Sequence, residues 1–130
     1  MNTTLYILIV DDSDIMQEIL SAALKSLGHR GVIVSNGEEA LRCLEQRNFD
    51  LILLDVNMPV MDGLTTLKLL REKERDNAAA VTRTPVIFIT GNDLPSDLET
   101  YHTAGADGFI YKPVKFPQLD SEIKRVLGKT

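Results

Sequence analysis

Five polar residues close or follow short apolar runs of this sequence: Asp11, Asp12, Asp55, Thr90 and Lys112. Three carboxylates that lie close together repel one another and raise their own pKa values unless a cation neutralises them. Mg²⁺ suits an open site of this kind, because it binds one or two carboxylates together with phosphate oxygens. A lysine ammonium and a threonine hydroxyl would stabilise phosphoryl oxygens. These residue types therefore indicate phosphoryl transfer, with Asp55 as the nucleophile that forms an aspartyl phosphate.

The hydrophobic pattern predicts a fold that could bring these residues together. Apolar runs rich in β-branched residues predict strands at residues 5–10, 31–35, 51–55, 86–90 and 108–111. Helical segments are predicted at residues 14–27, 37–47, 63–74, 95–104 and 117–127. Three of the strands are apolar nearly throughout, which is typical of a parallel sheet covered by helices on both faces. The alternation predicts a doubly wound (βα)5 α/β fold, with residues 1–130 as one domain.

In the flavodoxin-like form of such a sheet the strand order is 2-1-3-4-5, and ligands bind at the carboxyl ends of the strands. The first, third, fourth and fifth predicted strands are then neighbours. Because the five polar residues stand at the ends of these four strands, we expect their side chains to converge in one pocket.

The first predicted helix carries a broad apolar stripe that we expect to face the sheet. The stripe consists of Ile15, Ile19, Ala23 and Leu27, with Met16, Leu20 and Leu24 beside it. Ser13 is predicted to cap the start of this helix, and Gly28 to adopt a left-handed conformation just past its end. Asp62 is predicted to cap the third helix.

Composition excludes several classes of function. The chain has 130 residues, of which 44% are hydrophobic and 25% are charged, as in an average globular domain. Its net charge of −5 lacks the basic surplus of a nucleic-acid-binding protein, so no direct nucleic-acid partner is expected. The single Cys43 cannot form an internal disulfide, and no apolar run approaches the roughly 18 residues of a membrane span. We therefore expect a cytoplasmic protein that does not contact a membrane.

Four stretches of the sequence match a known family: residues 7–12 (ILIVDD), 53–63 (LLDVNMPVMDG), 89–91 (ITG) and 112–113 (KP). With these stretches the chain resembles the receiver domain of two-component response regulators, from Tyr6 to Leu127. The resemblance implies that Asp55 is the phosphoacceptor. It also implies that Mg²⁺ is bound by Asp12, Asp55 and the backbone carbonyl of Asn57, with Asp11 reaching the ion through water.

The resemblance further implies a signalling role and a conformational switch. Thr90 and Lys112 would contact the phosphoryl group, and Phe109 would turn into the space that the Thr90 side chain vacates. The implied phosphodonor is a histidine kinase or a phosphotransfer protein, and the output is altered binding of an unidentified protein target. Such a domain catalyses only its own phosphoryl uptake and loss and is not otherwise an enzyme.

One departure from the family pattern and two positions that tune its chemistry accompany this resemblance. The connection at residues 75–84 is longer than in a typical receiver and is similar to receivers attached to hybrid sensor kinases. Asn57 and Asn92 stand where the family tunes the rate of dephosphorylation.

Three alternatives remain open. A phosphatase of the haloacid dehalogenase type also uses an aspartyl nucleophile, but it needs an acidic residue where this chain has Asn57, and an amide cannot donate that proton. A flavodoxin-like cofactor binder is disfavoured, because no phosphate-binding loop rich in Gly, Ser and Thr follows the first strand. The third alternative is an interaction module of the same fold that works without phosphorylation, through its fourth helix, fifth strand and fifth helix.

Overall fold

Five parallel strands alternate with five helices in the computed structural model, which describes residues 4–58, 60–76, 83–91 and 95–128. The elements are β1 (Tyr6–Val10), α1 (Asp14–Ser26), β2 (Arg30–Val34), α2 (Gly37–Gln46), β3 (Leu51–Asp55), α3 (Gly63–Asp76), β4 (Val86–Thr90), α4 (Pro95–Thr103), β5 (Gly108–Tyr111) and α5 (Phe116–Val126). The strand order is β2-β1-β3-β4-β5, which confirms the predicted fold. The predicted boundaries match those of β3, β4 and β5, and the other boundaries differ from the observed ones by at most two residues.

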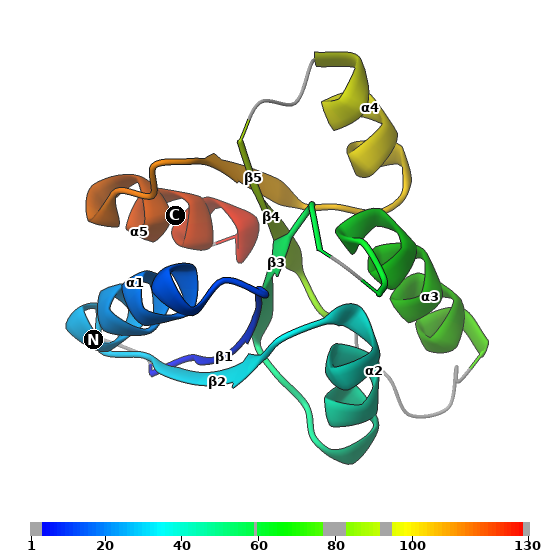
Figure 1. Cartoon of the computed structure of the whole chain (residues 1–130), viewed down its shortest axis with the longest axis horizontal. Coiled ribbons are helices and arrows are strands. Elements are labelled where there is room, and N and C mark those ends of the chain that lie inside the picture. The colour runs from blue at the N-terminus through cyan, green and yellow to red at the C-terminus, as the bar shows by residue number, and fades with distance from the viewer. Residues whose placement is uncertain (1–3, 59, 77–82, 92–94, 129–130) are drawn as a thin grey trace.

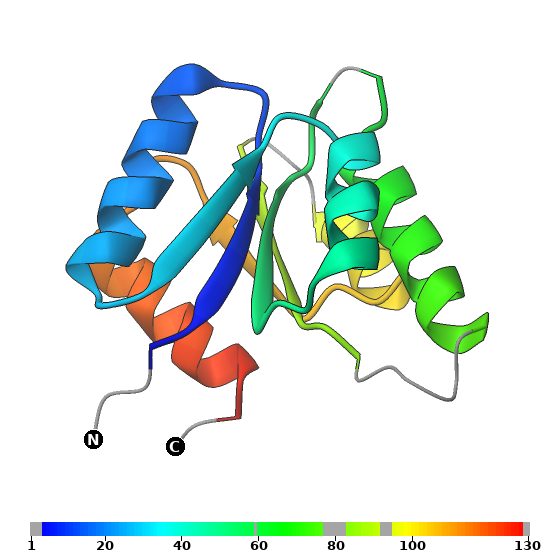
Figure 2. The same cartoon turned by 90° about the horizontal axis from the view of Figure 1, so that it is seen from below.

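The helices cover both faces of the sheet. Helices α1 and α5 lie on one face, and α2, α3 and α4 lie on the other (Figures 1 and 2). Strands β3 and β4 are buried along their whole length, because both of their faces meet helices. Alternate strand residues therefore enter two separate cores, with Ile9 and Leu53 facing α1 and α5, and Leu8 and Phe88 facing the other layer.

Local hydrogen bonds set the helix boundaries where the sequence predicts them. The Ser13 Oγ accepts from the Met16 N–H at 3.3 Å, and an Asp62 carboxylate oxygen accepts from the Thr65 N–H at 2.8 Å. Gly28 adopts a φ of +86° just past α1, which a residue without a Cβ reaches without strain. All three predictions are thus confirmed, and the start of α1 is fixed directly beside the end of β1.

The prediction for the apolar stripe of α1 is wrong in part. Leu20, Ala23 and Leu24 are buried against the sheet, whereas Ile15 and Ile19 are 71% and 38% exposed. Successive residues advance by about 100° around a helix, so these two isoleucines lie on the flank of the buried arc. Helix α1 therefore presents an apolar flank to solvent.

Ion pairs hold both ends of the lengthened connection between α3 and β4. Glu74 accepts from the Thr84 N–H at 2.8 Å and pairs with Arg71 at 2.8 Å. Asp107 pairs with Arg71 at 3.1 Å and with Arg83 at 2.7 Å. Residues 77–82 of the connection lie outside the described residues. The network ties α3 to the segment that leads into β5.

None of the helices in the described part of the chain combines the length and hydropathy that a bilayer crossing needs. The cytoplasmic location stays a prediction.

His29 couples the start of β1 to the end of α1, and this contact predicts a dependence of stability on pH. The His29 Nδ1 accepts from the Leu5 N–H at 3.1 Å, which requires a neutral imidazole. Partial burial lowers the pKa of His29 below 6.5, although Asp120 and Asp50 oppose the shift. The stabilisation is therefore fully present above pH 6.5 and is lost as the pH falls through the folded-state pKa. We expect chemical denaturation to show a loss of about 0.5–1.5 kcal/mol on acidification, the size of one hydrogen bond.

The control for this prediction is His29→Asn, because its side-chain oxygen can accept the same hydrogen bond and does not titrate. Subtracting the free energy of unfolding of the variant from that of the wild type at each pH removes the contribution of groups that titrate in both proteins. An identical pH dependence of the two proteins would contradict the role of His29.

Candidate functional site

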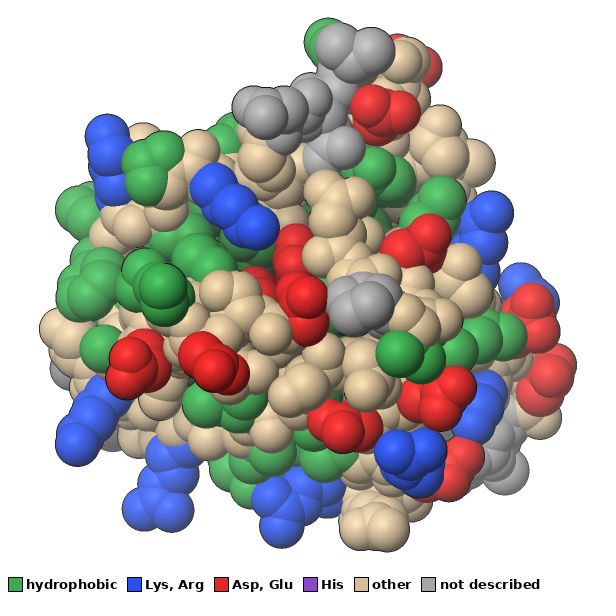
Figure 3. Space-filling view, in the orientation of Figure 1, with side chains coloured by type: hydrophobic (Ala, Val, Ile, Leu, Met, Phe, Trp, Pro, Cys, Tyr) green, Lys and Arg blue, Asp and Glu red, His purple; other side chains and the backbone are tan. Residues whose placement is uncertain are grey.

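Three carboxylates meet at the carboxyl edge of the sheet. Asp11 and Asp12 follow β1, and Asp55 is the last residue of β3, the neighbouring strand. One oxygen of each carboxylate lies within 4.8 Å of the others, and acidic side chains gather near the centre of this face (Figure 3). Asp11 and Asp55 are buried, whereas Asp12 is exposed. The arrangement leaves a concentration of negative charge with one side open to solvent.

The burial of these carboxylates disfavours their charged forms. The pKa of Asp55 is raised to about 6, chiefly by burial and then by the Asp11 carboxylate, against the lowering effect of Lys112. Burial also raises the pKa of Asp11, while a hydrogen bond from the Ser13 N–H at 2.9 Å opposes that shift. The Asp11 Oδ2 atom is buried and has no hydrogen-bond partner among the described residues. An orphaned carboxylate oxygen beside two further carboxylates fits a hard divalent cation.

A lysine ammonium and a threonine hydroxyl complete the arrangement. The Lys112 ammonium lies 3.6 Å from Asp55 Oδ1. Thr90 ends β4, and its Oγ1 is buried without a hydrogen-bond partner in the described part of the chain. The backbone N–H of Lys112 donates to the Thr90 carbonyl at 2.8 Å, so the ends of β4 and β5 are joined here.

The structure thus brings Asp11, Asp12, Asp55 and Lys112 into one site, with Thr90 on the strand between Asp55 and Lys112. The Asn57 backbone N–H lies 3.3 Å from Asp55 Oδ1 and donates to it. Asn92 lies outside the described residues.

Phe109 stands apart from the carboxylates, in an aromatic cluster on the face that α4 covers. Its ring centroid is 6.4 Å from those of Phe88 and Tyr101, and the Phe88 and Tyr101 rings are 5.1 Å apart. Tyr101 is the one buried residue that α4 contributes. This contact was not predicted, because hydrophobic periodicity does not specify which helix residue packs against which strand residue.

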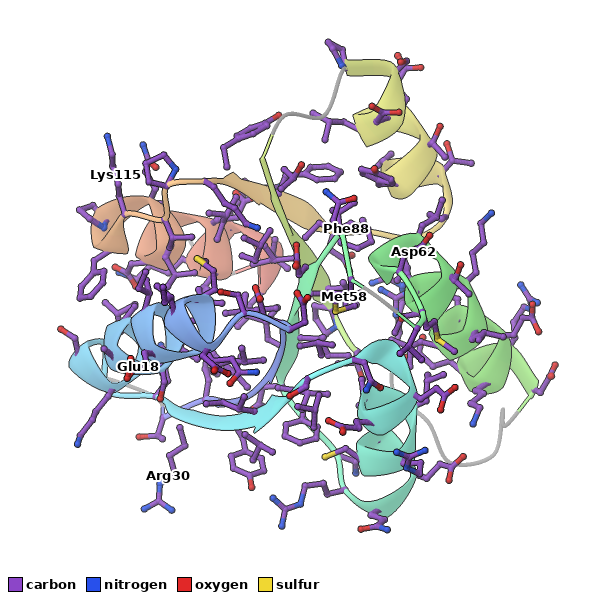
Figure 4. The ribbon with its side chains drawn as sticks, in the orientation of Figure 1. Glu18, Arg30, Met58, Asp62, Phe88 and Lys115 are labelled. Carbon is purple, nitrogen blue, oxygen red and sulfur yellow. The ribbon has the colours of Figure 1, made fainter. Side chains whose placement is uncertain are left out.

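The loop between β3 and α3 is closed tightly around Asp55. The Gly63 N–H donates to the Val56 carbonyl at 2.9 Å. A Cβ on Gly63 would lie 2.4 Å from the Asp55 carbonyl oxygen and 2.8 Å from the Phe88 ring, so only glycine fits there. Figure 4 labels Met58 and Asp62 on this loop and Phe88 on the neighbouring strand β4. The loop conformation is therefore set by contacts with the strand that carries Asp55.

Val60, in the same loop, was not singled out by the sequence. Its φ is +70°, the one positive value of a residue other than glycine in the described part of the chain, and its side chain is 75% exposed. The left-handed region is a genuine outlier for a β-branched residue and costs about 1–3 kcal/mol. No packing within the described residues offsets this strain.

Comparison with known proteins places this site in a family. The family model described as the response regulator receiver domain matches residues 7–124. The chain belongs to the response regulator receiver family. The resemblance found in the sequence is thereby confirmed over nearly the whole chain, and the receiver domain is a signalling domain of two-component systems.

Its relatives include large histidine kinases. A probable histidine kinase 1 of Oryza sativa subsp. indica is 32% identical over 93% of this chain and 15% of its own length. The hybrid signal transduction histidine kinase K of Dictyostelium discoideum is 35% identical over 93% of this chain and 10% of its own length. The receiver domain therefore spans less than a sixth of the length of either kinase.

A solved receiver structure shares the fold. The receiver domain of the sensor histidine kinase PA1611 from Pseudomonas aeruginosa PAO1 has a TM-score of 0.84 and 33% identity, covering 98% of this chain and all of that one. That structure holds a magnesium ion in its active site cleft. In the present chain, the cluster of Asp11, Asp12 and Asp55 could hold a metal ion.

Repulsion between the buried carboxylates predicts that neutralising one of them stabilises the metal-free protein. In EDTA, Asp11→Asn should raise the free energy of unfolding by about 1 kcal/mol, because an amide at this position can donate to the neighbouring carboxylates. Urea denaturation measures the change. Asp12→Asn is the matched control and should change stability less, because Asp12 is exposed. Equal effects of the two substitutions would show that burial does not concentrate the repulsion at Asp11.

Proposed function

We propose that this receiver domain accepts a phosphoryl group on Asp55 from a histidine kinase or a histidine phosphotransfer protein, and that phosphorylation alters its binding of a downstream protein. The observation that carries the proposal is the Asp55 carboxylate, which ends a central strand 3.6 Å from the Lys112 ammonium and beside two further carboxylates. We take residues 1–130 as one such domain.

The chemistry assigned to the chain is an in-line displacement at phosphorus. A carboxylate oxygen of Asp55 attacks the phosphorus, the bond to the donor nitrogen breaks, and the histidine leaves with its electron pair. Lys112 balances charge on the phosphoryl oxygens, and the Thr90 hydroxyl donates to one of them. Mg²⁺ held by Asp11, Asp12, Asp55 and the Asn57 carbonyl would neutralise further charge on those oxygens.

The unpartnered Thr90 hydroxyl supports the switch that the resemblance implies. Its Oγ1 has no hydrogen bond within the described residues, so a phosphoryl oxygen on Asp55 would offer it a strong acceptor. Movement of Thr90 toward that acceptor opens space on the face of β4 that also carries Phe88. Phe109 pairs with Phe88 across the sheet and is the aromatic side chain placed to fill that space.

A protein donor is favoured by the apolar flank of α1. Ile15 and Ile19 are exposed on the helix that begins two residues after Asp12, next to the acidic cluster. Exposed aliphatic side chains beside a site mark a surface that another protein can cover. A small phosphate donor would leave this flank in water.

The proposed domain is not otherwise an enzyme and has no direct nucleic-acid partner. Asn57 stands two residues after Asp55, and its amide cannot act as the general acid of a haloacid dehalogenase-type phosphatase. Repeated turnover of phosphate monoesters would reverse this assignment.

Phosphoryl uptake tests the proposed function directly. Incubation with acetyl phosphate and Mg²⁺ should add one phosphoryl group to the wild type, measured by intact-mass spectrometry. Asp55→Asn should abolish uptake, because an amide is not a nucleophile toward phosphorus. Lys112→Ala should slow uptake by about 100- to 1,000-fold, the effect of losing one group that stabilises charge in the transition state.

Equal labelling of the wild type and Asp55→Asn would refute the phosphoacceptor assignment. Absence of uptake by a folded wild type that binds Mg²⁺ would favour an interaction module that works without phosphorylation.

The switch has its own test in hydrogen exchange. In the wild type, phosphorylation should change the exchange protection of α4 amides by about tenfold, because Phe109 leaves its contact with Tyr101. Thr90→Val keeps the shape of the side chain but removes the hydroxyl, so it should still take up a phosphoryl group while the change in α4 disappears. An unchanged response of α4 in phosphorylated Thr90→Val would exclude Thr90 from the switch.

A further inference from the structure

Val60 combines two unfavourable features, a strained backbone and an exposed apolar side chain. A β-branched residue is held in the left-handed region at a φ of +70°, and its side chain remains 75% exposed. Glycine or asparagine adopts this conformation with less strain. A strained backbone that gains no burial points to a use of the side chain outside the chain itself.

Closure of the loop explains why the strained conformation persists. At one end the Val56 N–H donates to the Ile89 carbonyl at 3.2 Å, and at the other the Gly63 N–H returns to the Val56 carbonyl at 2.9 Å. Asp62 also caps α3 through the Thr65 N–H. Because both ends are fixed, the chain must reverse within a few residues, and Val60 supplies the left-handed turn. Closure accounts for the backbone angle but not for the choice of valine.

The position of Val60 limits what its side chain can contact. It lies in the loop that follows Asp55 directly and contains Asn57, whose N–H contacts the Asp55 carboxylate. Any macromolecule that delivers a phosphoryl group to Asp55 must approach this edge of the sheet. A donor as small as acetyl phosphate has no atoms to place against an exposed valine.

We propose that Val60 is a specificity-determining residue that packs against an apolar side chain of the protein phosphodonor. The inference rests on the proposed function and adds a contact that acts on protein donors alone. The left-handed backbone presents the two Val60 methyl groups to solvent, and the donor covers them when it places its phosphohistidine at Asp55.

Two substitutions separate the side chain from the backbone strain. Val60→Ala removes two methyl groups and keeps a Cβ in the left-handed region, whereas Val60→Gly removes the side chain and the strain together. We expect Val60→Gly to raise the melting temperature by about 2–4 °C. Both variants should take up a phosphoryl group from acetyl phosphate at the wild-type rate.

The decisive measurement is the rate of phosphoryl transfer from a histidine kinase that phosphorylates the wild-type chain. The loss of labelled phosphate from the kinase over time gives this rate. Both variants should accept the phosphoryl group about 3- to 15-fold more slowly, as expected for losing one or two buried methyl groups. Ile33→Ala is the matched control, because Ile33 is also a β-branched residue, is 42% exposed, and lies on the edge strand β2. Ile33→Ala should take up a phosphoryl group at the wild-type rate from both acetyl phosphate and the histidine kinase.

Three results would overturn the inference. Wild-type rates of transfer from the kinase to both variants would show that the donor does not contact Val60. Equal slowing with the kinase and with acetyl phosphate would assign the effect to the geometry of the loop around Asp55. Slowing of Ile33→Ala to the same extent would show a general effect of surface apolarity. Failure of the proposed function is distinguishable, because the wild type itself would then take up nothing from acetyl phosphate.

Discussion

Concentrated negative charge at the carboxyl edge of the sheet is the constraint on which the rest of this structure depends. Asp11 and Asp55 are buried beside one another at the ends of neighbouring strands, and burial makes their charged forms unfavourable. A parallel sheet can hold such a site because every strand ends at the same edge. There the chain leaves the hydrogen-bonded sheet and continues as loops. Lys112 relieves part of the repulsion, and the exposed Asp12 carboxylate leaves the cluster open to solvent on one side.

The two apolar cores make this unfavourable edge tolerable. Strands β3 and β4 are buried along their whole length, so the strand that carries Asp55 is fixed by packing on both faces. Gly63 then brings the start of α3 against the backbone of Asp55, where any Cβ would collide. A rigid scaffold can hold like charges together because local relaxation would have to disturb well-packed strands. The same rigidity holds Val60 in a conformation that valine otherwise avoids.

The sequence predicted those features that depend on local pattern or on general rules of topology. Apolar β-branched runs identified all five strands, and the rule that ligands bind at carboxyl ends brought Asp11, Asp55 and Lys112 to one edge. The burial of Ile15 and Ile19 was predicted wrongly, because periodicity defines an arc of a helix but not how much of that arc the neighbours cover. The φ of Val60 depends on closure of a loop between distant contacts, which no local pattern contains.

Of the five helices, α4 contributes the fewest buried residues, and it lies next to the group that phosphorylation would move in the proposed switch. Helix α4 buries Tyr101 alone, and the Tyr101 ring contacts both Phe88 and Phe109. Thr90 and Phe88 belong to the same strand and face the same layer, so a shift of Thr90 toward a phosphoryl group changes the packing beneath that ring. Protein interiors do not leave a ring-sized void unfilled, and the element with fewest anchors moves most easily to fill it. In the proposed switch, a helix with one fully buried side chain would carry a change at Asp55 to the surface, while the strands that position Asp55 remain fixed.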